Sequence, residues 1–157
     1  MTRIGIEQLL YMMDEAFKDN PFHSLMKNLG AVRDDDWEWL PTDGSRSILH
    51  IVQHVAYAKY MYENHAFGDR SLTWDNPANV PAESSELIGW LQDGQNRLRG
   101  SVAALKDDGE LRQPRMMPWG TEANTRWMVN SQIQHDLYHA GEINHIRALH
   151  QRNDEQR

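Results

Sequence analysis

The sequence predicts an all-α protein, an antiparallel bundle of four long helices. Apolar residues recur at intervals of three and four over four long segments, which is the spacing of amphipathic helices. Runs that alternate between apolar and polar residues, typical of strands, are nearly absent. A chain of 157 residues is long enough to bury the core of one domain, so we expect a single domain over residues 1–157.

The first two long segments have recognisable ends. In the first, apolar side chains form a stripe at helical spacing, namely Ile4, Leu9, Met12, Met13 and Phe17. Pro21 interrupts this segment, and a short helical run follows that ends at Gly30. The second segment begins with Ser45 or Ser47 as its N-terminal cap and continues to Gly68.

The third and fourth segments complete the predicted bundle. The third begins with Ser84 or Ser85 as its cap and ends near Gly109. The fourth runs from about Glu122 to Gln151. The links over residues 68–81 and 112–120 are rich in Pro, Gly, Asn and Trp, and we expect both to be loops.

Composition excludes several classes of function. The chain has no cysteine, so it can form neither a disulfide framework nor a thiolate metal site, and it has no cysteine nucleophile. A net charge of −7 without a basic cluster argues against nucleic-acid binding. No stretch approaches the roughly 20 apolar residues that span a bilayer. We therefore expect a soluble, cytoplasmic protein that has neither nucleic acid nor membrane as a partner.

A histidine pair in the fourth segment indicates part of a metal site. His135 and His139 are four residues apart, so they lie on one helix face one turn apart. Glu142 falls on the same stripe. Two imidazoles with this spacing can bind one divalent metal, as they do in the H-E-x-x-H arrangement. Zinc requires three or four ligands, however, so another element must supply the rest.

The second segment offers the missing ligand. His50 and His54 repeat the spacing of four residues, and His54 is flanked at helical intervals by apolar residues, which indicates that it points inward. His65 is eleven residues beyond His54, roughly 16 Å along the helix axis, and cannot share a metal with it. We predict the ligand set His54, His135 and His139, with His50 as a candidate fourth ligand.

These segments resemble the DinB-like family of four-helix-bundle metalloenzymes. In "QHVA" the resemblance places one ligand at His54, and in "HDLYHAGEI" it places the other two at His135 and His139. It extends from about Ser45 into the C-terminal helix. The glutamine that often follows the glycine in the family is Glu142 here, which leaves open whether Glu142 is a ligand, an orienting group or a base.

The resemblance implies a DinB-like bundle that holds a divalent metal through three histidines, with open positions for water or substrate. Zinc or nickel is the expected ion, with manganese and iron as alternatives. The resemblance also implies a homodimer. It implies activity as a metal-dependent hydrolase or as an S-transferase that uses a low-molecular-weight thiol such as bacillithiol, mycothiol or glutathione; a maleylpyruvate isomerase is also among the related proteins.

Such a site has defined chemical uses. A metal with an open position can lower the pKa of bound water toward about 7, or it can hold a thiolate. Because the chain has no cysteine, the thiol must come from a cofactor or substrate. Glu142 and Asp136 are the candidate catalytic bases. Two alternatives stay open: a non-catalytic, stress-related metal-binding protein, and a structural helical dimer that binds no metal.

Overall fold

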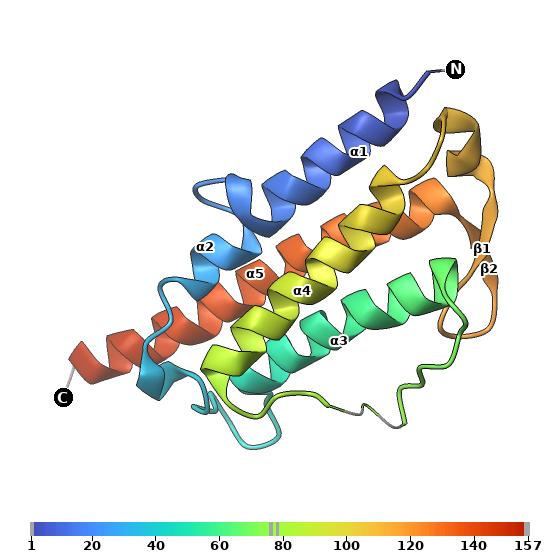
Figure 1. Ribbon diagram of the computed structural model, residues 1–157. Helices are drawn as coiled ribbons and strands as arrows, with labels where there is room; N and C mark the ends of the chain where they lie inside the picture. The colour runs from blue at the N-terminus through green and yellow to red at the C-terminus, as the bar shows by residue number, and fades with distance from the viewer. Residues whose placement is uncertain (1, 76, 78, 156–157) are drawn as a thin grey trace.

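The computed structural model confirms the predicted helical bundle. It describes residues 2–75, 77 and 79–155, so the predicted domain bounds at residues 1 and 157 lie outside the described residues. Four long helices pack side by side (Figure 1). They are α1 (Ile4–Asp14), α3 (Ile48–Phe67), α4 (Ser84–Ala103) and α5 (Thr125–Glu155). Among the described residues, no helix is both long and apolar enough to cross a membrane.

The shorter elements lie in the connections between the long helices. Those before α3 are η1 (Glu15–Asp19), α2 (Leu25–Leu29) and η2 (Asp34–Asp36). Those between α4 and α5 are η3 (Asp108–Arg112), β1 (Pro114–Met116) and β2 (Glu122–Asn124). The two strands pair antiparallel, with Met116 opposite Glu122. The first lies in the predicted loop over residues 112–120, whereas the second lies where the sequence predicts the start of the fourth helix, which begins instead at Thr125. Strands of three residues are too short for an alternating pattern to reveal them.

The helices do not simply alternate in direction along the chain. The link after α3 runs back along the bundle before α4 begins (Figure 1). As a result α3 and α4 run one way, while α1 and α5 run the other. The bundle is therefore antiparallel between these two pairs, and α3 and α4 lie parallel as neighbours.

The start of α3 is fixed by a side-chain cap. The hydroxyl of Ser47 accepts a hydrogen bond from the backbone N–H of His50, which satisfies one of the free donors at the helix N-terminus. Ser47, and not Ser45, is thus the N-terminal cap of α3. In α4 the residue at the cap position is Glu83, not Ser84 or Ser85, and the helix ends at Ala103, before the predicted end near Gly109.

The core consists of two apolar clusters. The first surrounds the N-terminal half of α3 and includes Ile51, Val52, Val55, Leu91 and Ile143. The second lies toward the β-hairpin and includes Ile6, Leu98, Val102, Met128 and Val129. Between the α5 residues of the first cluster (140–146) and those of the second (128–133) lies a polar stretch of α5, which contains both histidines of the predicted pair.

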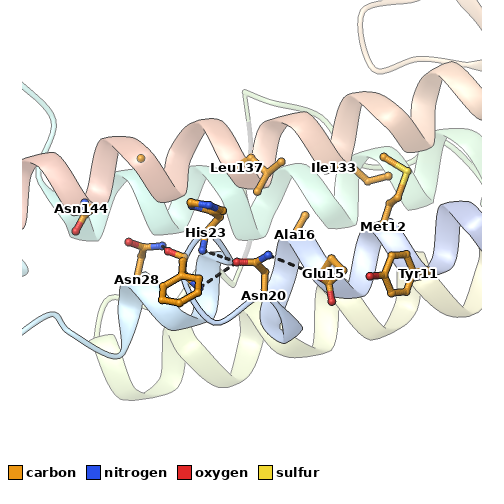
Figure 2. Close-up of a pocket in the computed structure, with 12 residues that line it drawn as sticks. Tyr11, Met12, Glu15, Ala16, Asn20, His23, Asn28, Ile133, Leu137 and Asn144 are labelled. Carbon is orange, nitrogen blue, oxygen red and sulfur yellow. Dashed lines mark hydrogen bonds between the residues drawn. The ribbon is translucent and has the colours of Figure 1, made fainter.

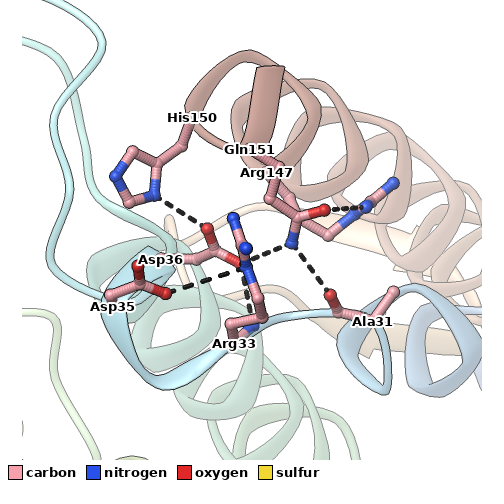
Figure 3. Close-up of polar contacts among 7 residues, drawn as sticks. All are labelled: Ala31, Arg33, Asp35, Asp36, Arg147, His150 and Gln151. Carbon is pink, nitrogen blue, oxygen red and sulfur yellow. Dashed lines mark hydrogen bonds and ion pairs between the residues drawn. The ribbon is translucent and has the colours of Figure 1, made fainter. Parts of the chain in front are cut away.

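A polar clasp holds the C-terminal part of α5 against the connection before α3 (Figure 3). The buried carboxylate of Asp36 accepts hydrogen bonds from the backbone N–H of Arg33 at 2.7 Å and from the side-chain amide of Gln151 at 2.8 Å. It also contacts Nδ1 of His150 at 2.8 Å. Although Asp35, Asp36 and His150 lie close enough to share a cation, protein donors already occupy the Asp36 oxygens. We therefore interpret this cluster as a structural clasp.

Candidate metal centre

Three histidine side chains meet between α3 and α5. Nε2 of His135 lies 3.0 Å from Nε2 of His54 and 3.2 Å from Nε2 of His139. One nitrogen from each ring lies within 4.8 Å of the other two, and the group can hold a metal ion. The structure thus brings together the three residues that the sequence predicted as ligands. We refer to them as the histidine triad.

The arrangement of the rings fits a cation. In tetrahedral zinc sites the Zn–N distance is about 2.0–2.1 Å, which separates neighbouring nitrogens by about 3.3 Å. The two Nε2–Nε2 distances of 3.0 and 3.2 Å in the triad are close to that separation. Nε2 of His135 therefore lies at about the separation from the other two rings that a shared ion requires.

Hydrogen bonding supports the same interpretation. The carboxylate of Glu142 lies 2.7 Å from Nδ1 of His139. In a neutral ring Nδ1 is then the N–H donor, and Nε2 carries a lone pair and lies 3.2 Å from Nε2 of His135. An ion at the centre would accept such lone pairs from all three rings. Nδ1 of His135 is buried and has no hydrogen-bond partner among the described residues.

Burial keeps the triad in the form that binds metal. It lowers the pKa of His54 and His139 below the ordinary value for histidine. Burial and the neighbouring rings lower the pKa of His135 further, to about 3. The carboxylate of Glu142 partly opposes this effect at His139. All three rings are therefore neutral at neutral pH. A metal ion can bind them without first removing a proton from a charged imidazole.

Glu142 lies on the outer side of the His139 ring. One oxygen contacts Nδ1 of His139, and the other accepts a hydrogen bond from the guanidinium of Arg46 at 3.2 Å. A carboxylate on the far ring nitrogen fixes the tautomer and orientation of a metal-binding histidine. Among the three roles left open for Glu142, these contacts match the orienting group. Its role as a base stays a prediction.

Asp136 has an environment that the sequence did not reveal. Its side chain is buried, and both oxygens accept hydrogen bonds from Nζ of Lys59, at 2.7 and 2.8 Å. Burial raises the pKa of the Asp136 carboxyl, and the ammonium of Lys59 opposes that rise. No hydrogen bond joins Asp136 to the triad in the described part of the chain, so its contacts give its predicted catalytic role no support.

The other α3 histidines lie outside the triad. His50 is exposed, and its Nδ1 lies 3.2 Å from the hydroxyl of Ser47. Nε2 of His65 contacts the backbone oxygen of Leu72 at 2.8 Å. The group of three ligand atoms does not include His50, the candidate fourth ligand.

The rim of the triad carries an aromatic side chain and a cation. Trp74, in the link between α3 and α4, stacks on the His54 ring at a centroid distance of 6.0 Å. The hydroxyl of Tyr57 donates to the backbone oxygen of Thr73 and fixes this part of the link against α3. Arg46, in the connection before α3, is the cation. Arg46 was not predicted from the sequence as part of the site. Its position directly before Ser47, the cap of α3, was the signal that could have identified it.

A separate groove lies on another face of α5 (Figure 2). It has a volume of about 520 Å³ and lies between α5 and the N-terminal segments. From α5 it is lined by Ile133, Leu137, Gly141 and Asn144, and its other walls include Tyr11, Met12 and Phe22. Leu137 and His139 differ by two residues, or about 200° around the helix, so the groove and the triad face different ways.

Comparison with known families gives one match. The family described as the DinB superfamily matches residues 20–143, which include all three histidines of the triad and Glu142. None of the curated proteins matches the chain.

Proposed function

Because the chain belongs to the DinB superfamily, we propose that it binds a divalent metal through His54, His135 and His139 and acts on a small molecule. The observation that carries this proposal is the convergence of three Nε2 atoms, two pairs of them 3.0 and 3.2 Å apart. The contact between Glu142 and His139 supports it, since such a contact orients a metal ligand.

The reaction that we propose is a metal-dependent hydrolysis or a thiol-dependent S-transfer. A bound divalent ion would supply Lewis acidity and an open position for water or a thiol. Three protein ligands leave such a position free, as in catalytic zinc sites. The thiol must be an external, low-molecular-weight one, because the chain has no cysteine. Zinc or nickel is the ion that we propose, with manganese or iron as alternatives.

The residues of this chain have separate tasks in that proposal. The triad binds the ion, and Glu142 keeps the N–H of His139 on Nδ1, so that Nε2 stays available. The ring of Trp74 covers one side of His54 and limits access of water there. Glu142 remains the better placed of the two predicted bases, since Asp136 is paired with Lys59.

Metal content tests the proposal directly. Untagged protein, purified and analysed for its elements, should contain about one divalent ion per chain. His54→Ala and His139→Ala should each lose the ion. His50→Ala is the matched control, because His50 is a histidine of α3 that lies outside the triad. It should keep the ion.

Two other results would contradict parts of the proposal. If the protein stays free of metal after incubation with zinc, nickel and manganese, the ligand assignment is wrong and the proposed reactions lose their chemistry. If metal binds and stabilises the fold, but neither thiols nor hydrolysable substrates react, the protein is a non-catalytic metal binder.

We also propose a cytoplasmic homodimer. Absence of cysteine fits the reducing cytoplasm. The groove along α5 has exposed apolar side chains, among them Tyr11, Phe22 and Leu137, that a second copy would cover.

A further inference from the structure

Arg46 lies beside the triad with most of its hydrogen-bonding capacity free. One guanidinium N–H contacts Glu142, and no other partner is recorded for this side chain among the described residues. The side chain is 49% exposed. A guanidinium has five N–H donors in a planar fork, so Arg46 can bind a second acceptor without leaving Glu142.

The charge of Arg46 lies beside the triad. Its guanidinium donates to one oxygen of Glu142, and the other oxygen of the same carboxylate contacts Nδ1 of His139. The carboxylate of Glu142 opposes this charge, whereas the Asp136 carboxylate is paired with Lys59. A divalent ion at the triad together with the Arg46 guanidinium would carry more positive charge than Glu142 offsets, although the whole chain carries a charge of −7.

An apolar surface lies on the other histidine. Arg46 reaches the triad through Glu142 and His139, whereas Trp74 stacks on His54. The Trp74 side chain is 41% exposed, and its ring packs edge-on against Tyr57. A ligand at the triad can thus contact a flat apolar ring at one side and a cation at the other.

From this geometry we propose that Arg46 binds a carboxylate group of the substrate, and that the substrate is a small carboxylic acid with a planar or apolar body. The inference rests on the proposed metal site. A single guanidinium matches a singly charged, planar carboxylate with two parallel hydrogen bonds. Because Glu142 and the His139 ring separate Arg46 from the Nε2 atoms, the carboxylate and the reacting group stand at opposite ends of the substrate. The body between them packs on Trp74.

A simpler role for Arg46 is to hold Glu142 in place. The two roles differ in what Glu142→Gln does. If Arg46 only positions Glu142, then Arg46→Gln and Glu142→Gln weaken ligand binding alike. If Arg46 binds the carboxylate, Glu142→Gln removes a competing anion, and ligand binding stays equal or becomes tighter.

The experiment uses benzoate as the probe and benzamide as its uncharged counterpart of the same shape. Zinc-loaded protein labelled with nitrogen-15 is titrated with each, and the indole N–H signal of Trp74, assigned with Trp74→Phe, is followed by NMR. Arg97→Gln is the matched control, since Arg97 is also exposed and paired with a carboxylate, that of Asp93. Zinc content is measured in every sample.

Benzoate should shift the Trp74 signal of the wild-type protein, and benzamide should shift it much less. Arg46→Gln should weaken benzoate binding by about tenfold or more, with its zinc content unchanged. Arg97→Gln and Glu142→Gln should bind benzoate at least as tightly as the wild type. Equal binding of benzoate by Arg46→Gln and wild type, or equal loss in Arg46→Gln and Glu142→Gln, would overturn the inference. If the wild type takes up no zinc, the proposed function fails, and the same titration of metal-free protein still decides the role of Arg46.

Discussion

At the scale of single residues, the ion pair of Lys59 and Asp136 places two opposite charges in the protein interior. Lys59 is fully buried on α3, and Asp136 is buried on α5 next to a triad histidine. Two short hydrogen bonds join them. Each charge is tolerated only because the other is present, since an unpaired buried charge is costly.

Replacing one residue of this ion pair should therefore lower the free energy of unfolding more than replacing both. We expect Lys59→Met to lower the free energy of unfolding by about 3–5 kcal/mol, because it leaves the Asp136 carboxylate buried and unpaired. The double variant Lys59→Met/Asp136→Leu should recover most of that loss. Urea unfolding followed by circular dichroism measures both. Arg97→Met, which breaks an exposed pair with Asp93, should cost less than about 1 kcal/mol.

The histidines of the site could be predicted from sequence, but their supporting residues could not. His135 and His139 share a helix, so a spacing of four residues places them together, and the inward position of His54 follows from its apolar neighbours. Lys59 and Arg46 contact partners 77 and 96 positions away in the chain. Such contacts depend on how helices pack, which local spacing does not determine.

At the scale of elements, the close approach of α3 and α4 depends on a glycine. A Cβ atom at Gly94 would lie 2.8 Å from Cε2 of Tyr60. The Tyr60 ring cannot easily move away, because it stacks on Trp90 at 4.5 Å and its hydroxyl donates to Asp93 at 2.8 Å. Gly94 thus lets the backbone of α4 pack beside the part of α3 that carries Lys59.

Two glycines of α4 should respond oppositely to the same change. Gly94→Ala should destabilise the fold by about 1–3 kcal/mol through overpacking against Tyr60. Gly89→Ala should stabilise it by roughly 0.5–1 kcal/mol, because its Cβ would meet nothing within 4 Å and alanine favours the helix. Thermal and urea unfolding of the two variants check this. A similar gain in both would show that α3 and α4 can move apart at no cost.

At the scale of the whole molecule, the number of long helices could be predicted but their directions could not. The link between α3 and α4 covers residues 68–83, sixteen residues that can extend to about 50 Å. A helix of twenty residues is about 30 Å long, so this link can either turn at once or run back along the bundle. Local sequence distinguishes a loop from a helix, but it does not tell where a long loop leads.

The groove on α5 gives a test of the proposed homodimer. Leu137→Glu places a charge in the apolar groove and should convert the dimer to a monomer, because burying an unpaired carboxylate is unfavourable. Leu40→Glu is the control, since Leu40 is similarly exposed, at 47% against 42%, but lies outside the groove. Sedimentation velocity measures the assembly state of each. A wild-type monomer, or a Leu137→Glu dimer, would show that this groove does not mediate assembly.

The triad and its rim belong to different kinds of structure. All three histidines lie within long helices, whereas Arg46 and Trp74 lie in the connections on either side of α3. Changes in those connections can alter what the site accepts without disturbing the helices that hold the histidines. If the triad acts on a small molecule as proposed, the helices would hold the metal ligands, and the two connections would determine which molecules fit beside them.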